Sequence, residues 1–176
     1  MIFVTIGTQG PFDRLIRAVD QTASSLNDPI IAQVSKGGAY KAKNMITSEF
    51  MPITEFNSNF AQARLIISHA GMGTIISALV QNKPILVLPR LSKFKEQRND
   101  HQWATAKEFE KRNFVHTAYD EDELQEKLRA LVKGDLEPLF HIGRYASRDL
   151  IESVKSDLNY SRQVRAEASN SFSGLF

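Results

Sequence analysis

Near its middle the sequence reads Leu65-Ile-Ile-Ser-His-Ala-Gly-Met-Gly-Thr-Ile-Ile-Ser-Ala-Leu-Val80, and shortly afterwards Lys83-Pro-Ile-Leu-Val-Leu-Pro89. The first apolar run predicts a buried strand, the two glycines predict a tight turn, and Thr74–Gln81 has the pattern of a helix. The second apolar run predicts another strand. Together they form one strand–turn–helix–strand unit, which is typical of a parallel α/β sheet.

The start of that helix is a candidate anion site. Its unpaired backbone N–H groups, with the hydroxyl of Thr74, would face a ligand above the end of the strand. A glycine turn by itself often has only a conformational role. Here the context favours phosphate binding, because Ser68 and His69 are polar at the strand end and a second polar glycine loop spans Thr8–Gly10.

The rest of the chain continues the alternation of strands and helices. Phe56 and Phe60, four residues apart, are expected to pack on one face of a helix capped by Thr54, and Asp120 with Glu123 predicts a capping-box-like start. We expect a single Rossmann-like parallel sheet with helices on both faces, with its ligand at the carboxyl ends of the strands. The expected strands are 2–6, 29–34, 48–51 and 114–117, and the expected helices are 12–25, 54–63, 99–112, 120–132 and 144–158.

Length and composition limit the classes of protein. The 176 residues suffice for one domain, which we place at residues 1–160, followed by a tail (161–176) that is flexible or docks onto a partner. A net charge of +2 does not favour nucleic-acid binding. The chain has no cysteine, no apolar run long enough for a membrane span and no signal-peptide pattern, so a cytoplasmic location is expected.

Two polar features allow more than one interpretation. His69 would suit a catalytic base, but no Asp or Glu lies between Arg64 and Gln81 to orient it, so a loop-shaping role is favoured. The segment Glu96–Gln102 reads as a solvated loop, or, if it returns to the ligand edge, as a source of groups for sugar hydroxyls. The basic residues nearby would either steer an anionic ligand or only keep the loop soluble: Arg90, Lys93, Lys95 and Arg98.

Several motifs, in order along the chain, carry a resemblance to a known family. They are Val4-Thr-Ile-Gly-Thr8, Ser68-His-Ala-Gly-Met-Gly-Thr74, Lys83-Pro84 with its apolar strand, and Asp100-His-Gln102. These motifs resemble the C-terminal domain of family 28 glycosyltransferases, and more narrowly its stand-alone Alg13-like and PssE-like subunits.

The resemblance implies the donor-binding half of a two-lobed GT-B enzyme, cytoplasmic and held at the membrane by an anchored Alg14-like or PssD-like partner that carries the acceptor lobe. The implied reaction is inverting transfer of a hexose or N-acetylhexosamine from a UDP-sugar to a polyprenyl-diphosphate-linked sugar, in exopolysaccharide or lipid-linked oligosaccharide biosynthesis. No metal or other cofactor is implied, and the base would belong mainly to the partner. The implied UDP-sugar-binding residues are Gly7, Thr8, Gln9, Gly10, Ser68, His69, Gly71, Met72, Gly73, Thr74, Glu96, Asp100, His101 and Gln102.

One position departs from the family pattern. In the murein branch a glutamate three residues after the helix-start threonine holds the donor ribose, and here that position is Ser77, which supplies no carboxylate. We therefore expect ribose contacts from Glu96 or Asp100. A noncatalytic accessory subunit is the alternative function. An unrelated dinucleotide oxidoreductase is disfavoured, because no full G-x-G-x-x-G follows Ile6.

Overall fold

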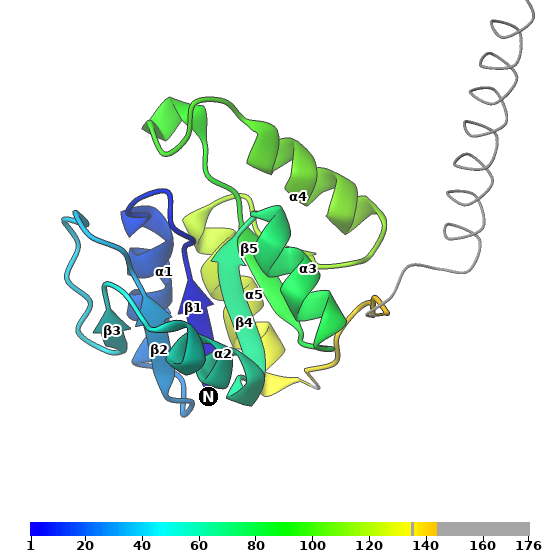
Figure 1. The fold of residues 1–176 in the computed structure, drawn as a ribbon, viewed down its shortest axis with the longest axis horizontal. Helices are drawn as coiled ribbons and strands as arrows, with labels where there is room; N and C mark the ends of the chain where they lie inside the picture. Colours follow the sequence, from blue (N-terminus) through cyan, green and yellow to red (C-terminus); the bar gives the residue numbers. More distant parts are fainter. Residues whose placement is uncertain (135, 144–176) are drawn as a thin grey trace, which may run out of the picture. The chain divides into compact units, whose positions relative to one another are not determined.

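Six short strands form one fully parallel sheet in the order β3-β2-β1-β4-β5-β6 in a computed structural model that describes residues 1–134 and 136–143 (Figure 1). The strands are β1 (Ile2–Thr5), β2 (Ile30–Gln33), β3 (Ile46–Ser48), β4 (Leu65–His69), β5 (Ile85–Leu88) and β6 (His116–Thr117). The helices are α1 (Asp13–Ala23), α2 (Ile53–Gln62), α3 (Met72–Val80), α4 (His101–Lys111) and α5 (Glu121–Lys133), with a short 3₁₀ turn at Ser92–Phe94.

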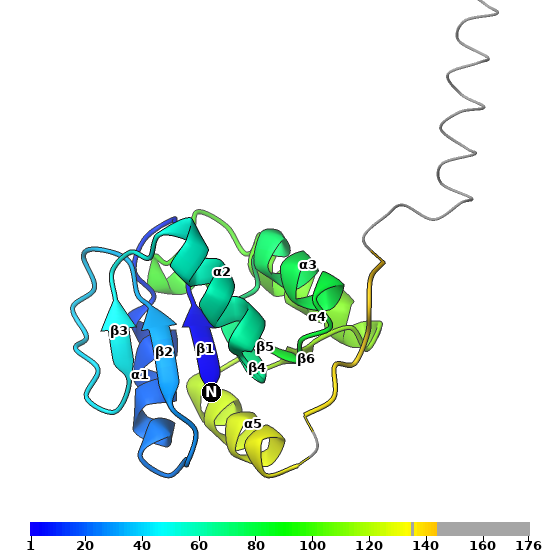
Figure 2. The ribbon, with the colours of Figure 1, turned by 60° about the horizontal axis from the view of Figure 1, so that its bottom comes forward.

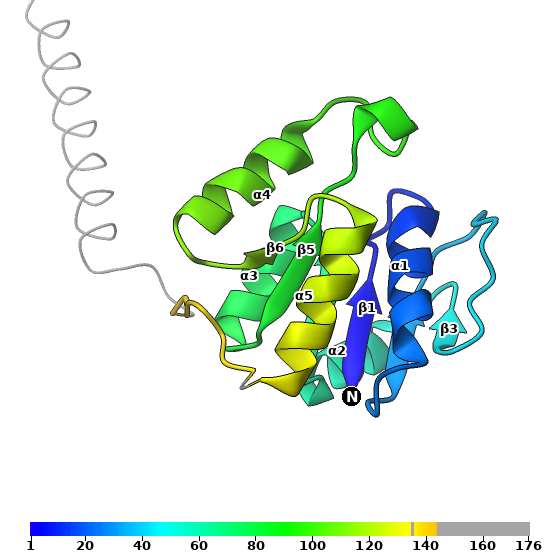
Figure 3. The same ribbon diagram turned by 180° about the vertical axis from the view of Figure 1, so that it is seen from behind.

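Helices cover both faces of the sheet, and each face has its own apolar core. Successive side chains of a strand point to opposite faces. In β1, therefore, Ile2 and Val4 belong to the core shared with α1 and α5, whereas Phe3 belongs to the core shared with α2 and α3. Figure 3 shows α1 and α5 over one face, and Figure 2 shows α2 and α3 over the other. The expected parallel sheet with helices on both faces is confirmed.

Helix α2 packs as expected but begins differently. Phe56 and Phe60 lie on the same side, with ring centroids 5.2 and 6.2 Å from that of Phe3. The N-cap is Pro52, with no side-chain cap, so the predicted cap at Thr54 is wrong. Thr54 is already inside the first helical turn, where its hydroxyl cannot take the N-cap position.

Helix α3 begins two residues earlier than expected. Gly71 is its N-cap, in an extended conformation with φ −85°, and Gly73 is part of the first turn rather than of the preceding loop. The backbone N–H of Gly71 is bonded to the carbonyl of His69 at 2.8 Å. The helix therefore presents the free N–H groups of Met72, Gly73 and Thr74 at its start.

At the far edge of the sheet, β3 lies about two residues before its predicted position. Ser48 closes the strand by accepting the N–H of Val34, and the N–H of Met51 turns instead to the side-chain oxygen of Gln33 at 3.1 Å. The side chain of Gln33 thus replaces the next rung of the ladder. Helix α5 starts as predicted, because Asp120 Oδ1 accepts the N–H of Glu123 at 2.8 Å.

The expected helix at 144–158, the tail at 161–176 and the boundary between them lie outside the described residues. Within the described part of the chain, none of the helices combines the length and the apolar character needed to span a bilayer.

Candidate functional site

The candidate site lies where the chain changes direction across the sheet. Strands β1 and β4 are neighbours, yet β1 is followed by strands on one side of the sheet and β4 by strands on the other. In open parallel sheets such a switch point leaves a crevice beyond the carboxyl ends of the strands. A hollow of about 520 Å³ opens there, between the loop after β1 and the start of α3.

Most of the predicted binding residues line this hollow. They are Gly7, Thr8, Gln9, His69, Gly71, Met72, Gly73, Thr74, His101 and Gln102. Gly10, Ser68, Glu96 and Asp100 lie outside it. The carbonyl of Gly10 accepts from Arg90, Ser68 Oγ is buried and donates to the carbonyl of Thr5, and Asp100 Oδ1 accepts the N–H of Ser92 at 2.7 Å.

The hollow also contains residues that were not predicted as ligand contacts: Thr5, Gln33, Phe56, Phe60 and Ser77. Gln33 is held by its Oε1, which accepts from Met51, so its amide Nε2 is left to face a ligand. Gln33 could have been recognised in the sequence as Ser68 and His69 were, because it is a polar residue that follows an apolar strand. Phe56 and Phe60 serve both the core and the wall of the hollow.

The ring of His69 packs between the two glycine loops. A Cβ atom at Gly71 would lie 2.2 Å from His69 Nε2, and one at Gly7 would lie 2.7 Å from His69 Cε1. Gly7 also has φ +73°, a conformation that residues with a side chain rarely adopt. Both glycines are therefore required for the close approach of the imidazole, and His69 shapes the loops, as the sequence favoured.

The surroundings of His69 keep its imidazole ring neutral. Burial, and then the positive charge of Arg90, lower the pKa of His69 to about 4, so the ring is neutral at pH 7. Ser68 Oγ lies 2.8 Å from the carbonyl of Thr5 and 3.1 Å from His69 Nδ1, so Ser68 holds the ring in place through that nitrogen.

The hollow combines polar groups with apolar side chains, and among the described residues of its wall there is no charged side chain, whether Asp, Glu, Lys or Arg. An anion would be held by the free N–H groups and positive dipole of α3, with hydroxyl and amide groups of the β1 loop, rather than by a cationic side chain. The described residues that line the hollow therefore include no carboxylate that could act as a general base.

The buried Gln102 completes the far wall. Its Oε1 accepts the backbone N–H of Arg90 at 3.2 Å, which leaves its Nε2 as a donor toward the hollow. Next to it, His101 is hydrogen-bonded to Asn99 and Gln97. Residues 1–134 and 136–143 contain no group of three His, Asp or Glu side chains placed to hold a metal ion.

A fully parallel sheet in this strand order, with the start of a helix at its switch point, defines a Rossmann-like domain. Its structural neighbours are GT-B glycosyltransferases, of which it matches the C-terminal half. The model of the glycosyltransferase family 28 C-terminal domain matches residues 1–154, and the chain belongs to that family.

Individual relatives agree with this assignment. The chain is 29% identical over 119 residues to the mouse "UDP-N-acetylglucosamine transferase subunit ALG13", a match that covers 62% of this chain and 10% of that protein. The solution structure of ALG13 has a TM-score of 0.56 at 21% identity, covering 87% of this chain and 93% of that one. MurG of Acinetobacter baumannii has a TM-score of 0.54 at 17% identity, over 73% and 40% of the two chains. At sequence identities of 21% and 17%, these two structures show only that the fold is shared.

Proposed function

We propose that this chain is the UDP-sugar-binding subunit of a two-chain inverting glycosyltransferase. The observation that carries the proposal is the uncharged hollow between two glycine loops, at the switch point of a family 28 domain. Two relatives support the choice of nucleotide: mouse ALG13 is named as a UDP-N-acetylglucosamine transferase subunit, and Os79 from O. sativa, with a TM-score of 0.56, was solved in complex with UDP. The transferred sugar would be a hexose or an N-acetylhexosamine.

The hollow offers a distinct place for each part of the donor. The diphosphate would lie at the free N–H groups of Met72, Gly73 and Thr74, where no bound cation is needed to favour an anion. The uracil ring of UDP would lie toward Phe56 and the Gln33 amide. The sugar would lie toward Gln102, whose Nε2 is a free donor.

A second chain is proposed because the hollow contains groups for binding but no carboxylate base. We place the base and the acceptor site on a membrane-anchored Alg14-like or PssD-like subunit, with a polyprenyl-diphosphate-linked sugar as acceptor. The complex would work at the cytoplasmic side of the membrane, in exopolysaccharide or lipid-linked oligosaccharide biosynthesis. Neutral His69 is then a donor-site residue rather than the principal base.

Thermal unfolding in the presence of UDP tests the proposal. A ligand at 100 times its dissociation constant adds about 2.7 kcal/mol to the free energy of unfolding, so millimolar UDP should raise the melting temperature by several degrees. Thr74→Val removes a hydroxyl from the hollow and should reduce that rise. Thr54→Val, in the first turn of α2 but outside the hollow, is the matched control. An unchanged melting temperature with millimolar UDP would count against donor binding.

The accessory function remains the second candidate because of Ser77. This serine lies in the wall of the hollow at the position where the murein branch has its ribose-binding glutamate, and no other carboxylate of the described residues replaces it there. An accessory subunit would stimulate a separate transferase without binding UDP. The same titration distinguishes the two functions.

A further inference from the structure

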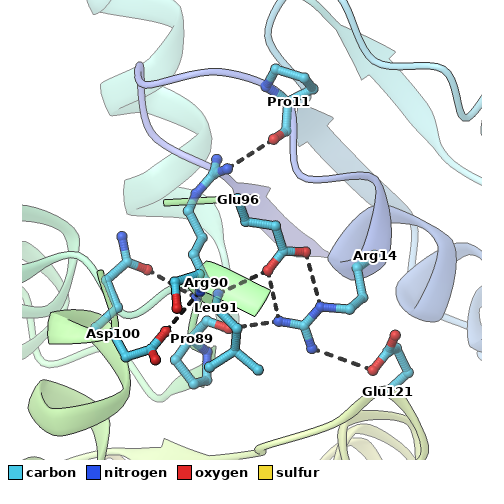
Figure 4. Close-up of polar contacts among 10 residues, drawn as sticks. Pro11, Arg14, Pro89, Arg90, Leu91, Glu96, Asp100 and Glu121 are labelled. Carbon is cyan, nitrogen blue, oxygen red and sulfur yellow. Dashed lines mark hydrogen bonds and ion pairs between the residues drawn. The ribbon is translucent and has the colours of Figure 1, made fainter. Parts of the chain in front are cut away.

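The loop that leads from β5 to α4 is tied to the start of α1 by one ion pair. Arg14 Nε and Nη2 donate to the two carboxylate oxygens of Glu96, both at 3.0 Å, and the two side chains are 9% and 11% exposed (Figure 4). Arg14 Nη2 also donates to the carbonyl of Pro89 at 2.7 Å, and Glu96 Oε2 accepts the N–H of Leu91 at 3.0 Å. Two-pronged arginine–carboxylate pairs of this kind fix orientation as well as distance.

Both carboxylate oxygens of Glu96 are already engaged within the protein. One oxygen accepts from Arg14, and the other accepts from Arg14 and from Leu91. Its position in the sequence suggested a ligand contact, but its bonds lie within the protein. The carboxylate joins the start of its own loop, at Leu91, to Arg14 of α1.

Arg90 extends this connection to the hollow. It is 1% exposed, and its guanidinium donates to the carbonyls of Ile6, Gly10 and Pro11 at 2.8–3.0 Å. Its backbone N–H donates to Gln102, so one residue holds both the glycine loop after β1 and the amide on the far wall. The ring of Phe12 lies 4.6 Å from the Arg90 guanidinium carbon and 5.3 Å from that of Arg14.

We infer that Arg14 and Glu96 are positioning residues, a clasp that holds the β5–α4 loop so that Gln9, His101 and Gln102 meet around the donor. The inference rests on the proposed function for the identity of the ligand. The role of Arg14 and Glu96 in holding the loop does not depend on which ligand binds. Arg14 and Arg90 both lie next to Phe12, and the negative charge of Glu96, together with that of Glu121 at 3.3 Å from Arg14 Nη1, offsets these two guanidinium groups.

The loop also separates two hollows. A second hollow of about 750 Å³ lies along it, lined by Gln9, Ser92, Lys95, Glu96, Gln97, Arg98, Asn99 and His101. Gln9 and His101 line both hollows. Release of the clasp would therefore move the shared wall and change the shape of the donor site, although neither Arg14 nor Glu96 lines that site.

The chain's single tryptophan, Trp103, reports on this wall, because it follows Gln102 in the first turn of α4 and is 39% exposed. We expect Glu96→Gln and Arg14→Lys to increase quenching of Trp103 by acrylamide and to weaken UDP binding roughly tenfold, the effect of losing about one hydrogen bond to the ligand. In the double variant the loss should be less than the product of the two single losses.

Asp28→Asn is the control for a merely structural effect. It removes the ion pairs of Asp28 with the N-terminus and Arg64, at the opposite end of the sheet, and should lower stability without changing Trp103 quenching or UDP affinity. Equal quenching and equal UDP affinity in the wild type and in Glu96→Gln would overturn the clasp. So would a loss of affinity in Glu96→Gln with none in Arg14→Lys, because that pattern indicates direct contact with the ligand. A wild type that binds no UDP contradicts the proposed function, whereas the quenching comparison still tests the clasp.

Discussion

His69 packs against two glycines in the wall of the hollow. The imidazole fills the space where a side chain at Gly7 or Gly71 would be, so the loop after β1 and the start of α3 approach each other through this ring. A small change at either glycine should therefore act on both loops at once.

Gly71→Ala tests this arrangement. Its Cβ would lie 2.2 Å from His69 Nε2, so the ring or the loop must shift. We expect a loss of about 1–3 kcal/mol in the free energy of unfolding, the usual range for overpacking, measured by urea denaturation. Gly73→Ala is the matched control, because a Cβ there meets nothing within 4 Å and alanine favours the helix. Equal effects of the two substitutions would contradict the packing described.

The pKa of His69 predicts a pH dependence of stability. Its folded-state pKa of about 4 lies below the ordinary value of 6.5, so between these values the unfolded chain binds the proton more strongly. Stability should therefore fall as the pH is lowered from 6.5 towards 4, by up to about 1.4 kcal/mol per pH unit from this group. Urea denaturation at pH 7 and pH 5 should show a smaller difference for His69→Gln than for the wild type. An identical difference would mean that His69 is not a buried neutral ring.

Single-residue roles were the hardest to predict from the sequence. In the sequence Arg90 is one of four basic residues in a polar loop. In the structure it is buried against three carbonyls, which belong to a segment some eighty positions earlier in the chain. Glu96 was predicted as a ribose contact, and its bond to Arg14 could not be foreseen because Arg14 is distant in sequence. Gly71 and Gly73 had local signals, whereas Gln102 became a candidate through the place of its loop after β5 and through the resemblance to family 28.

At the scale of elements, helix starts were predictable where a side chain makes the cap. Asp120 and Glu123 form the expected bond at the start of α5. In α2 and α3 the N-caps are Pro52 and Gly71, neither of which makes a side-chain cap, so the first helical residue had no polar marker. The buried strands β1, β4 and β5 were found because each contains a run of buried apolar residues, whereas the edge strand β3 is mostly exposed and was misplaced by about two residues.

Because α5 has a side-chain cap and α2 has none, substitutions at their starts should change the free energy of unfolding by different amounts. Asp120→Ala should lower the free energy of unfolding by about 1 kcal/mol, because the N–H of Glu123 loses its acceptor. Thr54→Ala should change it by less than about 0.5 kcal/mol, since Thr54 is exposed and caps nothing. Urea denaturation at pH 7 measures both. A Thr54→Ala loss as large as that of Asp120→Ala would restore Thr54 as the cap.

At the scale of the molecule, the described residues form one Rossmann-like lobe whose binding edge is open. The two glycine loops, the start of α3 and the start of α4 come from separate parts of the chain and meet at the switch point between β1 and β4. The parallel sheet could be predicted because apolar strands alternate with helices along the sequence, whereas the order of the strands came only from the structure. The uncharged character of the hollow could not be predicted, since it depends on which loop residues turn inward.

Backbone amide resonances test whether UDP binds at the start of α3. In a titration of the ¹⁵N-labelled chain with UDP, we expect the amides of Met72, Gly73 and Thr74 to show the largest shifts, with smaller shifts at Thr8 and Gln9. The amide of Asp28, at the other end of the sheet, should not move. A spectrum unchanged at millimolar UDP, or shifts confined to residues outside the hollow, would contradict the account.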